Sequence, residues 1–221
     1  MTSLNTRRLD FSDVSLYWVT PDFTDTNKIL KITEQALDGG VDVIQLRSKS
    51  LSDRNLFEAG KKIQELCRKT NALFMVNNRV DLLLALDADG VHIGHEDLPP
   101  AFIRETIGHR RILGISTHSL PQAIEAQKNG ADYVSCGPIW ATPTKPDYPA
   151  VGLGLIGFYR AALKIPYVII GGINQSNIDQ IVQAGGKTVA VVRAIYDAPN
   201  PTEVAKNLKQ KIQVNRVQTV I

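Results

Sequence analysis

The chain has 221 residues, of which 43% are hydrophobic and 21% are charged. This balance excludes an intrinsically disordered chain, and no apolar run approaches the roughly 18 residues that a membrane span needs. The net charge of +3 gives no indication of nucleic-acid binding, and 2 cysteines are too few for a disulfide framework. The polar segment 1–13 lacks the apolar core of a signal peptide. We expect a cytoplasmic protein with reduced cysteines, a small-molecule role, no membrane attachment and no nucleic-acid partner.

Short apolar runs alternate along the chain with segments of helical periodicity. In chain order, strands are predicted at residues 16–20, 41–46, 72–76, 90–93, 112–115, 133–136, 167–170 and 188–192. Helices are predicted after N-caps at Thr26 and Ser52, over 80–86, after Pro99-Pro100, over 120–127 and 153–163, from about 178 up to Gly185, and over 201–212. A long loop is predicted from 137 to about 151.

The alternation of eight strands with eight helical segments indicates one α/β domain over residues 1–221. Strands that are apolar throughout favour a parallel sheet covered on both sides. A small residue followed by a polar one recurs before every second strand, as in Ala88-Asp89 and Ala131-Asp132, and indicates paired βα units. A closed (β/α)8 TIM barrel fits best, with its core over about residues 16–212 and short terminal extensions. The alternative, an open doubly wound sheet, lacks the Gly-x-Gly-x-x-Gly expected after its first strand.

Polar residues gather at the predicted carboxyl ends of the strands, where a barrel has its active site. Arg47, Lys49 and Lys145 place three cations at this end. Arginine can grip two phosphate oxygens with its planar fork, and lysine acts as a mobile point charge. The pair Gly171-Gly172 lets backbone N–H groups approach an anion. These residues predict a site for two phosphate-bearing ligands or one large one.

Other candidate residues leave two interpretations open. Asp97 is either a Mg²⁺ ligand or an acidic residue favoured at a helix start. His118 is either an acid–base group or a capping or structural residue, with the second favoured, and His92 is expected to be a hydrogen-bonded core histidine. Tyr17 and Trp140 are expected to pack, although either could stack on a heteroaromatic ligand.

A series of ordered motifs runs from about Leu16 to Ile212. They are Gln45-Leu46-Arg47-x-Lys49, Asn77-x-Arg79-Val80-Asp81, His92-x-Gly94-x-Glu96-Asp97-Leu98-Pro99, Gly114-x-Ser116-Thr117-His118-Ser119, Gly137-Pro138-Ile139, Thr142-Pro143-Thr144-Lys145 and Gly171-Gly172-Ile173. On these motifs the sequence resembles thiamine phosphate synthases, which are (β/α)8 transferases of thiamine biosynthesis.

The resemblance implies a substitution reaction. A pyrimidine diphosphate, 4-amino-5-hydroxymethyl-2-methylpyrimidine diphosphate, loses pyrophosphate, and the nitrogen of a thiazole phosphate, 4-methyl-5-(2-phosphoethyl)thiazole, takes the methylene carbon to give thiamine phosphate. The implied mechanism is dissociative, so cations and Mg²⁺ at the leaving group replace a strong base. The resemblance assigns Gln45, Arg47, Lys49, Asn77, Ser116 and Lys145 to the pyrimidine diphosphate, with Arg47, Lys49, Ser116 and Lys145 catalytic; Thr142, Thr144, Gly172, Val192 and Arg193 to the thiazole phosphate; and Asn78 and Asp97 to Mg²⁺.

Three residues depart from the family pattern. Asn78 stands where the family has an aspartate that binds Mg²⁺, and an amide oxygen coordinates without charge, so we expect weaker Mg²⁺ binding. His95 replaces a glutamine, and Arg193 stands where many members have serine, which adds a cation at the thiazole phosphate. Two alternative functions stay open: a thiazole tautomerase, a related isomerase that uses a histidine at the place of His118, and a non-catalytic ligand-binding relative. A homo-oligomer is also compatible with the sequence.

Overall fold

The computed structural model describes residues 11–218 and contains eight parallel strands closed into a barrel. The strands are β1 (Leu16–Val19), β2 (Val43–Leu46), β3 (Leu73–Asn77), β4 (Gly90–Ile93), β5 (Ile112–Thr117), β6 (Tyr133–Cys136), β7 (Tyr167–Ile170) and β8 (Val189–Val191). Each strand pairs with the next one in sequence, and β8 closes the barrel on β1, with Leu16 opposite Val189. The predicted (β/α)8 barrel is confirmed, and the open sheet is excluded.

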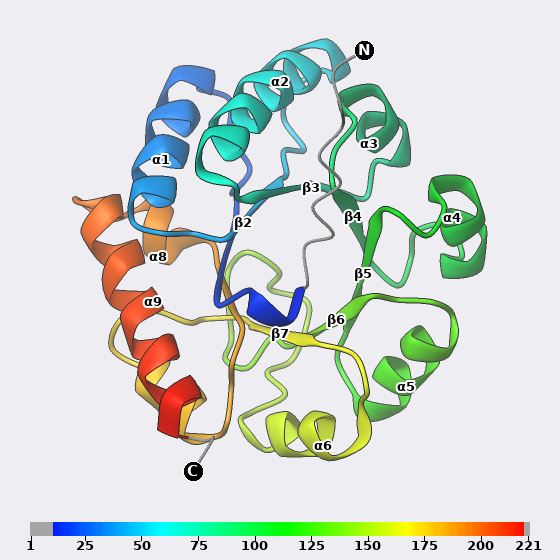
Figure 1. The fold of residues 1–221 in the computed structure, drawn as a ribbon, viewed down its shortest axis with the longest axis vertical. Helices are drawn as coiled ribbons and strands as arrows, with labels where there is room; N and C mark the ends of the chain where they lie inside the picture. The colour runs from blue at the N-terminus through cyan, green and yellow to red at the C-terminus, as the bar shows by residue number, and fades with distance from the viewer. Residues whose placement is uncertain (1–10, 219–221) are drawn as a thin grey trace.

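A ring of helices surrounds the sheet (Figure 1). The helices are α1 (Thr26–Asp38), α2 (Asp53–Thr70), α3 (Val80–Leu86), α4 (Pro100–Ile107), α5 (Leu120–Lys128), α6 (Gly154–Ala162), α7 (Ile178–Gln183), α8 (Arg193–Tyr196) and α9 (Pro201–Gln218), and a 3-10 helix, Phe11–Asp13, precedes β1. Among residues 11–218, no helix is both long and apolar enough to cross a membrane.

Three local predictions need correction. Asp25, not Thr26, caps α1, because its carboxylate accepts the N–H of Lys28 at 3.0 Å and Thr26 is already helical. The sequence does not predict the 3-10 helix or α8, because such short segments carry no helical period. Helix α9 runs past residue 212, since no glycine or proline follows to stop it. The rest of the predicted extensions, 1–10 and 219–221, lies outside the described residues.

Alternate residues of each strand enter two separate cores. In β1, Leu16 and Trp18 belong to the large core between sheet and helices, whereas Tyr17 and Val19 belong to a smaller core inside the barrel. Both faces of the strand are therefore buried. This is why the strands read as continuous apolar runs in the sequence rather than as alternating ones.

The inner core closes the N-terminal end of the barrel. Phe11 of the 3-10 helix stacks on the ring of Tyr133, with the ring centroids 4.1 Å apart. Gly114 of β5 makes room for that ring, because a Cβ at residue 114 would lie 2.2 Å from Tyr133 Cζ. Toward the carboxyl ends of the strands the inward-facing side chains become polar, as Gln45 and Ser116 do. Of the two ends of the described lumen, the carboxyl end is therefore the one suited to polar ligands.

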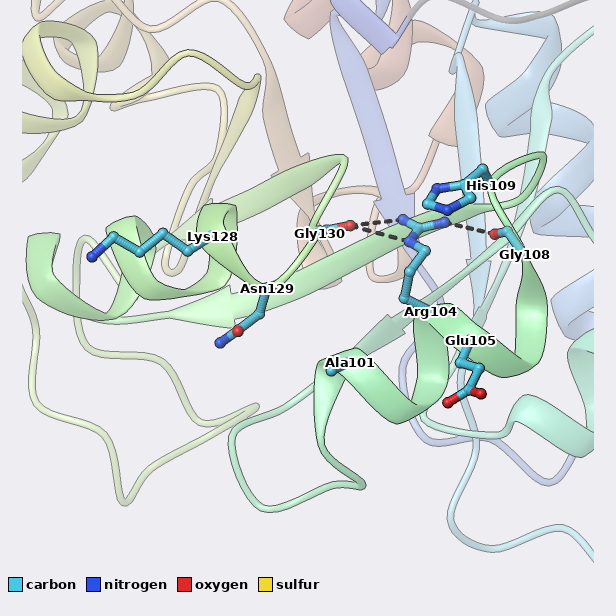
Figure 2. Close-up of a pocket in the computed structure, with 8 residues that line it drawn as sticks. All are labelled: Ala101, Arg104, Glu105, Gly108, His109, Lys128, Asn129 and Gly130. Atoms are coloured by element: carbon cyan, nitrogen blue, oxygen red, sulfur yellow. Dashed lines mark hydrogen bonds between the residues drawn. The ribbon is translucent and has the colours of Figure 1, made fainter.

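An open depression of about 590 Å³ lies near the N-terminal ends of β5 and β6, between α4 and α5 (Figure 2). The guanidinium of Arg104 donates to the carbonyl oxygens of Gly108 at 2.8 Å and Gly130 at 2.9 Å, and it pairs with the carboxylate of Asp132. Only 8% of Arg104 is exposed. Figure 2 shows Lys128 pointing away from this guanidinium. The Arg104 guanidinium therefore joins the loop that follows α4 to the loop that follows α5, which is a structural role.

We expect Arg104→Ala to lower the free energy of unfolding by about 2–4 kcal/mol, because the buried guanidinium donates several part-buried hydrogen bonds to carbonyl oxygens and pairs with Asp132. Urea denaturation measures the change. Arg110→Ala, at an exposed position in the loop that follows α4, is the control and should change stability by less than about 0.5 kcal/mol. Equal stability of both variants would contradict the assigned role of Arg104.

Candidate active site

A cavity of about 720 Å³ lies at the carboxyl end of the barrel. Its lining draws on the ends of all eight strands or the loops that follow them. Every residue that the sequence predicts for a substrate or a metal lines this one cavity: Gln45, Arg47, Lys49, Asn77, Asn78, Asp97, Ser116, Thr142, Thr144, Lys145, Gly172, Val192 and Arg193. Residues separated by up to 148 positions, from Gln45 to Arg193, therefore share one site.

Arg47 and Lys49 follow β2 and are held by residues that follow β1. The Thr20 hydroxyl accepts the N–H of Arg47 at 2.8 Å and donates to the Arg47 carbonyl oxygen at 2.7 Å. Asp22 Oδ1 accepts the N–H groups of Lys49 at 2.8 Å and Ser50 at 3.0 Å. Partial burial opposes ionisation of Asp22, but these hydrogen bonds outweigh it and hold the pKa of this carboxyl below its usual value. The loop that carries both cations is thus fixed by a carboxylate.

Lys145 reaches the cavity from the long loop after β6. The residue as a whole is exposed, yet partial desolvation of its ammonium, and next the charge of Arg47, lower the pKa of Lys145. Its Nζ lies 5.4 Å from the ring centroid of Tyr148, and that ring lies 4.3 Å from the ring of His118. Gly172 permits this loop to pack, because its φ of +68° is left-handed and a Cβ there would lie 2.9 Å from Trp140 Cβ. The three predicted cations do converge.

Oxygen donors gather on the β3 and β4 side of the cavity. Asn78 has a φ of 60°, a left-handed conformation that asparagine tolerates, and its N–H donates to the His92 carbonyl oxygen at 2.9 Å. Asp97 Oδ2 accepts the Gly94 N–H at 2.6 Å, which shapes the loop after β4. In the described part of the chain, no group of three or more His, Cys, Asp or Glu side chains could hold a metal ion. An ion bound here would complete its coordination with oxygens of water or of a substrate.

The loops after β6 and β8 form the opposite wall. The N–H of Thr144 approaches Thr142 Oγ1 at 3.3 Å, which folds this threonine loop on itself. The Trp18 indole donates to the carbonyl oxygen of Val192 at 3.0 Å and fixes the end of β8. Arg193 opens α8 at the exposed rim. The unpredicted helix α8 is what turns the chain at Arg193.

Two histidines make the structural hydrogen bonds expected of them, but at different places from those predicted. His92 is hydrogen-bonded, as predicted, but it lines the cavity instead of lying in a sealed core. His118 does not cap α5: the cap is Ser119, whose Oγ accepts the Gln122 N–H, and His118 Nδ1 lies 2.5 Å from the Gly137 carbonyl oxygen. Desolvation lowers the pKa of His118, so this ring is neutral near pH 7 and donates from Nδ1.

Tyr17 and Trp140 pack as predicted, Tyr17 in the core of the lumen and Trp140 against the core between sheet and helices. Tyr17 also lines the cavity floor, whereas Trp140 is not among the residues that line the cavity. Tyr133 was missed as a site residue, although its place in β6 follows the same inward parity as Tyr17 in β1. The alternation of inward and outward residues along each strand is the signal in the sequence that could have identified Tyr133.

A protein-family model described as "Thiamine monophosphate synthase" matches residues 16–195 of the chain. The thiamine-phosphate synthase of Prochlorococcus marinus (strain MIT 9313) is 40% identical over 209 residues, which are 94% of this chain but 59% of that protein. The chain thus spans about three fifths of the length of several curated relatives that it matches. The thiamine-phosphate synthase of Chloroflexus aurantiacus is 42% identical over 186 residues, or 84% of this chain and 86% of that protein.

Two solved structures resemble the fold of this chain, and one of them also carries a thiamine phosphate name. A thiamine phosphate pyrophosphorylase from Pyrococcus furiosus superposes with a TM-score of 0.85 and 34% identity, covering 93% of this chain and 99% of that one. A 3-hexulose-6-phosphate synthase superposes with a TM-score of 0.65 at 20% identity, a likeness that concerns the fold alone.

We expect Asp22→Ala to weaken the binding of inorganic pyrophosphate by about tenfold. Removing an exposed negative charge would by itself tighten anion binding by less than about 1 kcal/mol. Losing hydrogen bonds that order the Lys49 loop, each worth about 0.5–1.5 kcal/mol, outweighs that gain. Calorimetric titration measures the affinity, and Asp38→Ala, which removes an exposed charge on α1, is the control. Tighter binding by Asp22→Ala would contradict the ordering role.

Proposed function

Since the chain belongs to the thiamine monophosphate synthase family, we propose that it is a transferase that joins 4-amino-5-hydroxymethyl-2-methylpyrimidine diphosphate to 4-methyl-5-(2-phosphoethyl)thiazole, releasing thiamine phosphate and pyrophosphate. The observation that supports this most strongly is the convergence of Arg47, Lys49 and Lys145 in one cavity. A diphosphate leaving group requires such a concentration of positive charge.

Bond breaking in this reaction leaves both electrons of the carbon–oxygen bond on the pyrophosphate, and the thiazole nitrogen then supplies the pair that forms the new carbon–nitrogen bond. Arg47 and the two lysines would stabilise the leaving pyrophosphate, and Ser116 would donate a hydrogen bond to it. Gln45 and Asn77 would orient the pyrimidine. Because the electrons leave with the phosphate, no strong base is needed.

The opposite wall would hold the thiazole phosphate. Thr142 and Thr144 offer hydroxyls, Gly172 and Val192 offer backbone, and Arg193 offers a cation at the rim. These groups lie on the loops after β6, β7 and β8, a common phosphate-binding region of such barrels. The two substrates would therefore bind in one cavity, each against the loops that follow different strands.

Mg²⁺ fits the oxygen donors of Asn78 and Asp97, which would hold it together with phosphate oxygens of the substrate. The bound ion would supply further positive charge at the leaving group. The single carboxylate of Asp97, with an uncharged amide beside it, predicts weaker binding than a pair of carboxylates would give.

The alternatives are less well supported. The named relatives are synthases, which favours neither a tautomerase nor a non-catalytic binding protein. His118, the residue that a tautomerase would use, engages its Nδ1 with a backbone carbonyl. We also infer a cytoplasmic location, because both Cys67 and Cys136 are buried free thiols.

The function is tested by mixing purified protein with both substrates and Mg²⁺ and following thiamine phosphate and pyrophosphate. We expect equal amounts of the two products, and a loss of about 100-fold or more in kcat/KM for Arg47→Ala, the usual effect of removing one preorganised charge. Arg54→Ala, at an exposed position of α2, is the control and should retain activity. No product from the native chain would overturn the proposal.

We expect Asn78→Asp to lower the Mg²⁺ concentration needed for half-maximal activity by about threefold to tenfold, because a second carboxylate attracts the ion more strongly. Aspartate also tolerates the left-handed conformation of residue 78. Asn71→Asp is a matched control, since Asn71 has a φ of 57° at the end of α2, outside the cavity lining. An unchanged Mg²⁺ dependence would remove Asn78 from the metal site.

A further inference from the structure

An unbroken row of hydrogen bonds crosses the floor of the cavity inside the barrel. Gln45 Nε2 donates to the Tyr17 hydroxyl at 2.6 Å, and the hydroxyls of Tyr17 and Tyr133 lie 3.0 Å apart. His92 Nδ1 lies 2.9 Å from the Tyr133 hydroxyl, and His92 Nε2 lies 2.9 Å from Ser116 Oγ. The row starts at one proposed substrate-binding residue and ends at another. Its middle members come from β1, β6 and β4.

Counting protons gives this row a direction. Each tyrosine hydroxyl has one proton to donate. Tyr17 accepts from Gln45, and in the described part of the chain Tyr133 is the other hydrogen-bond partner of its buried hydroxyl. The Tyr17 proton is therefore used only if it lies toward Tyr133, and the proton of Tyr133 then lies toward His92 Nδ1. Burial of the two tyrosines raises both of their pKa values, so neither hydroxyl ionises near neutral pH.

The imidazole of His92 continues the same order of proton donation to Ser116. Desolvation, and next the charge of Lys145, lower the pKa of His92 to about 3, so the ring is neutral and has one N–H. With Nδ1 accepting from Tyr133, that N–H must be on Nε2, where it donates to Ser116 Oγ. An oxygen that accepts from His92 has its own proton free for the cavity.

We propose that Tyr133 and His92 are positioning residues that hold His92 in its Nε2–H tautomer and thereby make Ser116 a hydrogen-bond donor toward the diphosphate. This inference rests on the proposed function for the identity of the anion. The opposite direction would turn the Ser116 proton toward His92 and present only lone pairs to the cavity. Lone pairs repel a phosphate oxygen, so the direction of the row determines whether Ser116 attracts or repels the leaving group.

The rest of the lumen holds the row in place. Tyr133 is clamped between the ring of Phe11 and the backbone of Gly114, and its ring lies 5.5 Å from that of His92. Tyr17 and Tyr133 are 2% and 0% exposed, so water does not compete for their hydroxyls. A buried row of this kind keeps one arrangement without reorganising when the substrate binds.

The tautomer is measured directly, without substrate, by nitrogen NMR of full-length protein labelled with ¹⁵N-histidine. Loss of one signal set in His92→Gln assigns the ring among the 4 histidines of the chain. We expect a neutral ring protonated on Nε2. A ring protonated on Nδ1, or on both nitrogens at pH 7, would overturn the inference while leaving the proposed function intact. Absence of product with the expected tautomer would instead count against the function.

Tyr133→Phe tests the link to Ser116. Without a donor at Nδ1, His92 can accept the Ser116 proton at Nε2, so we expect the tautomer signal to change and kcat to fall about tenfold. Tyr159→Phe is the matched control: it also removes a buried tyrosine hydroxyl, bonded to Thr117 outside the lumen, and should leave both readouts unchanged. In a Ser116→Ala background, Tyr133→Phe should cause no further loss in kcat. A further tenfold loss there would show that Tyr133 does not act through Ser116.

Discussion

Closure of the parallel sheet is the constraint on which the site depends. When eight parallel strands form a barrel, all of their carboxyl ends meet at one mouth, and every second side chain faces the axis. Arg47 and Lys145 therefore share a cavity although 98 positions separate them in the sequence. The same closure seals the other end, where Phe11 and Tyr133 fill the lumen. One polar mouth and one apolar plug follow from the alternation of residues in short strands.

Gathering cations at one mouth has an electrostatic cost. The pKa of Lys145 is lowered by desolvation and then by the charge of Arg47, so the cavity disfavours the charge of this lysine. Fixed contacts from outside the set offset this repulsion. Thr20 holds Arg47, Asp22 holds the Lys49 loop, and Tyr148 lies beneath the Lys145 ammonium. A bound diphosphate would replace the repulsion between the cations with attraction to an anion. The arrangement therefore favours anion binding.

The sequence predicts the order of the elements well because apolar runs and helical periods are local signals. The strand bounds agree with the structure to within two residues. The floor of the cavity is harder to predict, because it depends on which residues of several strands face inward together. His92 looks like a core histidine from its own strand, and only the meeting of β4, β5 and β6 reveals its contacts with Ser116 and Tyr133. Helix α8 is missed for the opposite reason: it is too short to carry a period.

The different exposure of the cations bears on turnover in the proposed reaction. Groups that stabilise a leaving pyrophosphate also retain it as a product, so an active site gains nothing from binding it with equal strength before and after bond cleavage. Arg47 is half-buried and fixed through its backbone, whereas Lys49 and Lys145 are exposed on loops. Exposed ammonium groups meet water more readily than a half-buried guanidinium and can follow the pyrophosphate outward. A half-buried arginine with two more exposed lysines therefore suits both stabilisation of the leaving group and its release.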